Sequence, residues 1–188
     1  CRSVPTGKLK QLPPFQYSHR RKKIVGTSVQ QVSIGVAGSV CAIAGILHRD
    51  GRPVERAALE VMGAAMAHRG PDGCGYFIGR RGGMSVGLVH RRLAIRDLSE
   101  AGRQPIESLN GDIAVVFNGE IYNDAPLARQ IQAQSGFVRR GHCDAEILPE
   151  AFALWGGDMF DRLRGMFAMA IWDAGHQELT LARDHLGI

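Results

Sequence analysis

The sequence predicts an α+β protein in which two mainly antiparallel sheets pack together with helices on the outside. Continuous apolar runs, such as residues 41–47 and 113–117, are typical of strands that are buried on both faces. The dipeptide Asn110-Gly111 is a strong hairpin signal. Strands and helices do not alternate regularly along the chain, which argues against a doubly wound parallel sheet.

The first half of the predicted fold follows a shift in composition near residue 40. The expected elements are, in order, a buried strand over 41–47, a helix over 54–68 and two strands over 76–79 and 84–95. The helix is indicated by apolar side chains at helical spacing, among them Ala58, Val61 and Met62. The run Gly70-Pro71-Asp72-Gly73 then breaks the chain.

The second half is expected to hold a strand over 113–117, a helix from Asn123 or Asp124 to about Gln134, a helix after Asp144, and a hairpin of 166–172 and 179–182. Pro149 conflicts with a helix that begins at Asp144, because an interior proline costs about 3 kcal/mol. That helix therefore either starts late, with Pro149 in its first turn, or is kinked.

Length and composition fit one domain with an appendage. The chain has 188 residues, of which 45% are hydrophobic and 22% are charged, and these values exclude an acidic disordered chain and a collagen-like one. A chain of this size can bury a core without disulfides or metals. No stretch approaches the roughly 18 apolar residues of a membrane span, so no membrane association is expected.

The positive charge is confined to residues 1–40. This segment holds seven basic residues and no acidic ones, whereas residues 41–188 carry 16 basic and 18 acidic side chains. The globular part has no basic surplus for phosphates, so no nucleic-acid partner is expected. Residues 1–40 are expected to be a disordered, solvated leader, with polyanion binding by the run 20–23 as the alternative.

The four cysteines indicate a reducing compartment. Cys1, Cys41, Cys74 and Cys143 show no C-x-x-C spacing and no ladder with histidine that would suit zinc, so no metal site is expected. They are too few for a secreted disulfide scaffold, which favours the cytoplasm. Residues 24–40 are too interrupted by polar side chains for a good signal peptide, and export is the less favoured alternative.

Six short motifs occur in a fixed order along residues 41–188. They are Cys41-Ala-Ile-Ala-Gly-Ile46, His68-Arg-Gly-Pro-Asp-Gly73, His90-Arg-Arg-Leu-Ala-Ile95, Asn118-Gly-Glu-Ile-Tyr-Asn123, Asp144-Ala-Glu146 and Arg164-Gly-Met-Phe-Ala168. In these motifs the sequence resembles the class II glutamine amidotransferases, and most of all the glutaminase domain of glutamine-hydrolysing asparagine synthetases. The resemblance implies a four-layer αββα sandwich of the N-terminal-nucleophile hydrolase type.

The resemblance also implies a catalytic group. Cys41 matches the nucleophile, whose own free α-amino group serves as the base in this family. An α-amine with a pKa of about 7.7–8.0 suits proton transfer at neutral pH. Asn118 and Gly119 match the two donors of the oxyanion hole. Without the resemblance, Cys41 would be inert packing in a strand and Asn118-Gly119 would be a turn.

The residues expected to bind glutamine come from three of the motifs, and are Arg92, Leu93, Ile95, Asn118, Gly119, Glu120 and Asp144. Arg92 matches the group that holds the substrate α-carboxylate, while Asp144 and Glu120 match groups near the α-ammonium and the amide. Arg69 and Asp72 are expected to order a loop. His68 and His90 are expected to be structural, because the mechanism needs no imidazole.

Three features depart from the family pattern. Cys41 is not the first residue, so residues 1–40 are interpreted as a removable propeptide or an upstream artefact, and the active form is expected to begin at Cys41. Ala42 stands where the family usually has glycine, and Arg96 where an apolar residue is common. The S-G-G-x-D-S loop that holds pyrophosphate in the synthetase domain is absent from this chain, so ATP and Mg²⁺ are expected only in a synthetase domain elsewhere, and no cofactor is expected in this chain.

The predicted function is release of ammonia from glutamine, for use by a synthetase domain in the same chain or in a partner. Two alternatives remain open: a glutaminase domain for sugar or phosphoribosyl amination, and an inactive glutamine-binding remnant or scaffold. A homodimer of the full-length protein is compatible with the resemblance.

Overall fold

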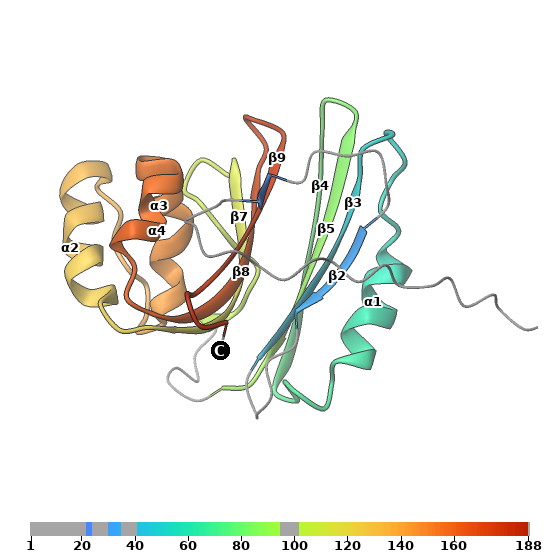
Figure 1. Ribbon diagram of the computed structural model, residues 1–188, viewed down its shortest axis with the longest axis horizontal. Helices are drawn as coiled ribbons and strands as arrows, with labels where there is room; N and C mark the ends of the chain where they lie inside the picture. Colours follow the sequence, from blue (N-terminus) through green and yellow to red (C-terminus); the bar gives the residue numbers. More distant parts are fainter. Residues whose placement is uncertain (1–21, 24–29, 35–40, 95–101, 188) are drawn as a thin grey trace, which may run out of the picture.

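The computed structural model describes residues 22–23, 30–34, 41–94 and 102–187, with side chains from Cys41 onward. Two sheets pack face to face, and each carries helices on its outer side (Figure 1). The structure is therefore a four-layer αββα sandwich, which confirms the predicted fold class.

The first sheet has four antiparallel strands. Their order is β2 (Gln30–Ile34), β3 (Ala42–His48), β5 (Met84–Arg92) and β4 (Gly73–Arg81). Helix α1 (Arg56–Ala65) covers the outer face and buries Leu59 against Ala44 and Val89. A helix forms within the predicted span and is shorter at both ends, but its buried face differs from the expected one. Leu59 and Gly63 are buried, whereas Val61, one of the residues that predicted the helix, is 71% exposed.

The second sheet has five antiparallel strands. Their order is β1 (Lys22–Lys23), β9 (Glu178–Arg183), β8 (Gly165–Asp173), β7 (Ile113–Ile121) and β6 (Ile106–Glu107). Its outer face carries the remaining helical elements, which are α2 (Asp124–Ser135), η2 (Asp144–Ile147), α3 (Leu148–Trp155), η3 (Gly156–Asp158) and α4 (Met159–Arg162). Helix α3 starts late with Pro149 in its first turn, so the first of the two alternatives for this proline is confirmed.

Both faces of the central strands are buried, which explains their continuous apolar runs. On β7, Ala114 and Val116 pack between the sheets, whereas Val115 and Phe117 pack against the helices. Successive side chains of a strand point to opposite faces, so each face needs its own set of apolar residues. The layer between the sheets also contains Trp172, which is 1% exposed.

Strand β5 ends at Arg92 and not at residue 95, and two other strands extend beyond their expected boundaries. Strand β7 continues through Asn118 and Gly119 to Ile121, so this dipeptide lies within a strand and not in a turn. Strand β4 begins at Gly73, earlier than expected, because Gly73 pairs with Arg92 at the end of β5. In both places pairing with a neighbouring strand overrides the local turn preference of glycine.

The segment before Cys41 differs from the expected disordered leader at seven residues. Strand β1 pairs with β9, and β2 pairs with β3, so the segment adds an edge strand to each sheet. Edge pairing uses backbone groups that any sequence offers, so composition alone does not reveal it. Removal of residues 1–40 stays a prediction. Among the described residues, no helix has both the length and the apolar composition needed to cross a membrane.

Candidate active site

The candidate site is centred on an open edge of β7. Strand β6 pairs only with Ala114 and Val115, so the later residues of β7 have no strand on that side among the described residues. Two side chains replace it: Oε1 of Gln104 accepts a hydrogen bond from the Phe117 N–H at 2.6 Å. A carboxylate oxygen of Asp144 accepts one from the Ile121 N–H at 2.7 Å.

The N–H of Gly119 faces the same edge, between those two bonded groups. Opposite Gly119 on β8 lies Phe167, whose N–H and C=O are both bonded to Asp184, on the side away from β7. The pair formed by Gly119 and Phe167 is therefore a non-hydrogen-bonded pair, and the Gly119 N–H points out of the ladder. No partner for this N–H is found among the described residues.

Only glycine fits at position 119. Its φ is +149°, in a region that L side chains rarely adopt, and an added Cβ would collide with the backbone oxygen of Met166. The neighbouring Asn118 is 3% exposed, and its Oδ1 has no partner in the part of the chain that the structure describes. Gly119 thus presents an unpaired backbone donor, whereas the unpartnered atom of the Asn118 amide is its oxygen, an acceptor.

Cys41 lies directly before β3 and is half-buried. Its Sγ is 3.3 Å from the backbone N of Leu93, which donates a hydrogen bond to it, and 3.7 Å from the Leu93 carbonyl oxygen. Burial raises the pKa of the Cys41 thiol, while the Leu93 contact and the charge of Arg92 oppose that rise. The thiol is therefore protonated at neutral pH and needs a base before it can attack.

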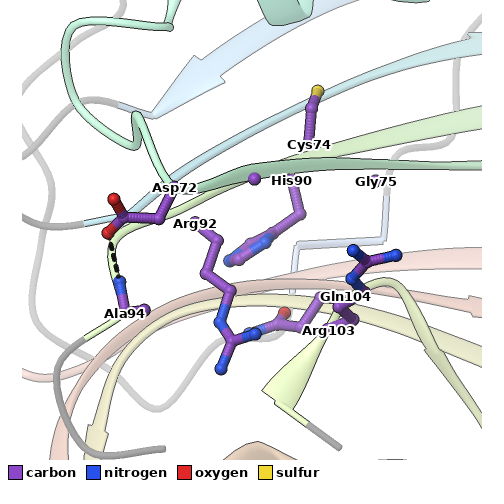
Figure 2. Close-up of a pocket in the computed structure, with 9 residues that line it drawn as sticks. Asp72, Cys74, Gly75, His90, Arg92, Ala94, Arg103 and Gln104 are labelled. Carbon is purple, nitrogen blue, oxygen red and sulfur yellow. Dashed lines mark hydrogen bonds between the residues drawn. The ribbon is translucent and has the colours of Figure 1, made fainter. Parts of the chain in front are cut away.

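Arg92 ends β5 and lines a pocket of about 370 Å³. The other lining residues are Asp72, Gly73, Cys74, Gly75, His90, Ala94, Arg103 and Gln104. Figure 2 shows Arg92, His90 and Gln104 directed into this space, whereas Cys74 points away from it. Gly75 allows the close packing here, because a Cβ at this position would collide with the backbone oxygen of Gln104.

Asp144 is 6% exposed and begins the helical segment η2. It lies close enough to Cys41 for its charge to contribute to the raised pKa of the thiol. Its two carboxylate oxygens accept the N–H groups of Ile121 and Ala145, at 2.7 and 3.1 Å. The carboxylate is thus held rigidly, with its negative charge near the cysteine.

The structure brings most of the predicted site residues into one region. Asn118, Gly119 and Glu120 follow each other on β7 and are joined to Asp144 through Ile121, whereas Arg92 and Leu93 lie beside Cys41. Ile95 and Arg96 lie outside the described residues. The individual roles of these residues in binding and catalysis stay predictions.

Two further residues of the sequence motifs serve the loops around the site. Asp72 orders the loop before β4, as expected, because its carboxylate accepts the Ala94 N–H at 2.8 Å. Asn123 stands at the start of α2, where its side chain does not cap the helix. Instead it bonds to the backbone of Arg162 and Arg164, and so ties the end of β7 to the turn before β8.

Sequence reasoning missed Gln104. Its bond to Phe117 spans the gap left by the short strand β6, and no local pattern distinguishes this glutamine from a solvated loop residue. The described residues contain no group of three or more His, Cys, Asp or Glu side chains that could hold a metal ion.

The fold is shared with a protein of known structure, and the family is shown by a sequence model. A glutamine phosphoribosylpyrophosphate amidotransferase structure from Bacillus subtilis has this fold: it matches 77% of this chain and 37% of its own with a TM-score of 0.55 and 19% identity. The model of the glutamine amidotransferase domain family matches residues 40–188. The chain belongs to this family, which confirms the resemblance.

Two curated relatives support the same assignment. The amidase chry2 of Gibberella zeae is 38% identical over 143 residues, which cover 76% of this chain and 21% of the relative. An asparagine synthetase [glutamine-hydrolyzing] 3 of Bacillus subtilis is 35% identical over 136 residues, which cover 71% of this chain and 21% of the relative. The chain thus spans about a fifth of the length of these relatives.

Proposed function

We propose that this glutamine amidotransferase domain hydrolyses glutamine to glutamate and ammonia with Cys41 as the nucleophile. The observation that supports this most is the Gly119 N–H, which faces the open edge of β7 next to the buried amide of Asn118. Two such donors suit the oxygen of a tetrahedral intermediate, for which each is worth about 2.7–4 kcal/mol. Cys41 directly precedes β3 and lies two residues before Ile43, whose side chain packs between the sheets. We infer that the alternation of β3 extends to Cys41, which would direct its sulfur to the interior that Asn118 faces.

The reaction then runs in two balanced steps. The α-amine of Cys41 takes the thiol proton, and the sulfur attacks the carboxamide carbon of glutamine. The C–N bond breaks, the leaving nitrogen takes the proton and departs as ammonia, and a thioester remains. Water then attacks the thioester carbon, releasing glutamate and restoring the thiol. The raised pKa of the Cys41 thiol makes such a base necessary at neutral pH.

The charged residues of the site are assigned to the two charges of the amino acid. Arg92 pairs with the α-carboxylate, for which a guanidinium fork is suited. Asp144 and Glu120 are assigned to the α-ammonium and the amide of glutamine. The backbone N–H of Leu93 donates to the sulfur of Cys41. This assignment places the negative charge of Asp144 close to Cys41, which agrees with its effect on the pKa of the thiol.

We further propose that the ammonia serves the amidation of aspartate, as the names of the asparagine synthetase relatives suggest. The synthetase domain that binds ATP and Mg²⁺ is then a separate domain, joined to this one or acting as a partner in the cytoplasm.

The test is to free the amine of Cys41 within the folded full chain. Replacing residues 37–40 by Ile-Glu-Gly-Arg creates a factor Xa site, so that cleavage makes Cys41 the first residue. We expect ammonia release from glutamine after cleavage, and none from the cleaved Cys41→Ala variant. Cys74→Ala is the matched control, since Cys74 is exposed and directed away from the pocket, and it should retain the parental rate.

The other results contradict the proposal in distinguishable ways. Full activity of the uncleaved protein would show that the amine of Cys41 is not the base. Parental activity of Cys41→Ala would refute the nucleophile. No ammonia from any form would favour the inactive remnant.

A further inference from the structure

His90 is a buried histidine for which the proposed mechanism has no use. It is 1% exposed and lies on β5 opposite Ile43, whose side chain packs between the two sheets. Its ring interacts with the backbone oxygen of Phe117 on the facing sheet, and this contact opposes the fall of the His90 pKa. Because Nε2 has no partner among the described residues, we assign the contact to Nδ1.

The two backbone groups of Phe117 therefore face side chains and not a neighbouring strand. The Phe117 C=O is assigned as the acceptor from His90, and the Phe117 N–H donates to Gln104 at 2.6 Å. In a continuous sheet a neighbouring strand would hold both groups. Here β6 begins at Ile106, opposite Val115, so it does not reach Phe117, and the two side chains take its place.

The position of this contact in the strand matters for the site. Phe117 directly precedes Asn118, so its C=O belongs to the peptide unit that leads into Asn118. A peptide unit is planar, so fixing its oxygen fixes the plane from which the Asn118 side chain departs. The Asp144 bond at Ile121 holds the strand on the other side of Gly119. Asn118 and Gly119 thus lie between Phe117, which contacts His90 and Gln104, and Ile121, which is bonded to Asp144.

His90 is also suited to act as a permanent neutral donor. Burial and the neighbouring charge of Arg92 lower its pKa to about 3, so the ring keeps one proton throughout the neutral range. With Nδ1 bonded to the Phe117 oxygen, that proton is on Nδ1 and Nε2 is bare. The ring therefore adds no second positive charge beside Arg92.

We propose that His90 and Gln104 are positioning residues, which clamp the backbone of Phe117 and so set the directions of the Asn118 amide and the Gly119 N–H. This inference rests on the proposed function. Neither residue needs to touch the substrate, and both act through the strand that carries the oxyanion donors. Their loss should impair the chemical step more than the binding of glutamine.

The kinetic test uses two amide replacements of His90. In His90→Asn the side-chain nitrogen lies where Nδ1 was and can still donate to Phe117, whereas His90→Gln places its nitrogen near the position of Nε2. With the cleaved full chain, we expect His90→Gln and Gln104→Met to lower kcat about 10- to 100-fold, as small misplacements in a site do. KM should change less than about threefold, and His90→Asn should retain most of kcat.

Ser85→Ala is the matched control. Ser85 is also a buried polar residue of β5, at the opposite end of the strand, about 17 Å from His90 at the usual rise per residue. Its replacement should leave kcat unchanged. Equal kcat for the Asn and Gln variants of His90, or an effect confined to KM, would overturn the proposal while leaving the glutaminase assignment intact.

A spectroscopic test is made on the unsubstituted protein and does not depend on its glutaminase activity. Nitrogen-15 NMR of the imidazole, assigned by the signal lost in His90→Asn, reports which ring nitrogen carries the proton. We expect a proton on Nδ1 and a bare Nε2 at neutral pH. A proton on Nε2, or a charged ring, would overturn the clamp. If the parent releases no ammonia, the proposed function fails, and this measurement still decides whether His90 holds Phe117.

Discussion

The carboxylate of Asp144 accepts a hydrogen bond from the backbone N–H of Ile121 at 2.7 Å, and so joins the helical layer to the open edge of β7. Gln104 makes the equivalent contact at Phe117, on the other side of Gly119. Two N–H groups on this edge of β7, those of Phe117 and Ile121, are thus hydrogen-bonded to side chains, and the Gly119 N–H lies between them. The candidate site lies where the sheet lacks a strand that would otherwise hold all three groups.

The first prediction separates the charge of Asp144 from its hydrogen bond. In Asp144→Asn the amide oxygen can still accept the Ile121 N–H, while the longer bond from the Ala145 N–H and the negative charge proposed to meet the substrate ammonium are lost. We expect KM for glutamine to rise about 10- to 100-fold, since hydrogen bonds to charged groups are worth about 1.5–3 kcal/mol. Steady-state kinetics of ammonia release measure this change. An unchanged KM would remove Asp144 from the substrate site.

Glu150→Gln is the control for that prediction. Glu150 is also a buried acid, and its carboxylate accepts the backbone N–H of Leu109 at 2.5 Å, before β7 begins, whereas Asp144 bonds the last residue of β7. Loss of its charge should lower the thermal midpoint and leave KM unchanged.

The second prediction concerns the backbone at Gly119. In Gly119→Ala the methyl group would face the Met166 oxygen at a φ of +149°, so strain and overpacking add. We expect the free energy of unfolding to fall by about 3 kcal/mol or more. Gly111→Ala has a φ of +76° but open space around the Cβ, and should cost only about 1–2 kcal/mol. Urea unfolding compares the two, and equal losses would show that the contact with Met166 is unimportant.

The third prediction follows from the lowered pKa of His90. Its pKa falls from 6.5 to about 3 on folding, mainly through burial. Below pH 6.5 the unfolded chain takes up a proton that the folded chain excludes, so stability falls as the pH falls from 6.5 towards 3. The loss approaches about 1.4 kcal/mol per pH unit. Urea unfolding of the parent should therefore show a steeper pH dependence than His90→Asn, and parallel curves would contradict the burial of a neutral ring.

Much of the fold could be predicted from the sequence because burial leaves a local pattern. The run 113–117 is apolar at every position since both faces of β7 are covered. The helical spacing located helix α1, but not its buried face, which is centred on Leu59 and not on Val61. Pro149 limited its helix to a late start or a kink, because its ring is unfavourable inside a helix, and the structure shows the late start.

Other features had no local signal. Asn118-Gly119 has the composition of a turn, and only pairing with β8 extends it into a strand. Gln104 and His90 both contact the backbone of Phe117, although they come from different parts of the chain. No local sequence pattern indicates that a polar loop residue and a polar strand residue contact the same peptide group. The edge strands β1 and β2 are made of backbone hydrogen bonds, which depend weakly on side-chain identity.

The sequence by itself determined the αββα class, the family and the residues proposed for the chemistry. Apolar periodicity and the order of the motifs are properties of the linear sequence, so they can be recognised without the structure. Only the tertiary structure decided which backbone groups remain unpaired. That outcome depends on where β6 stops relative to β7, and on the side chains of His90, Gln104 and Asp144 that reach the strand beyond it. Hydrogen bonding between distant segments is a property of the packed sheets, so it became visible only when both sheets were in place.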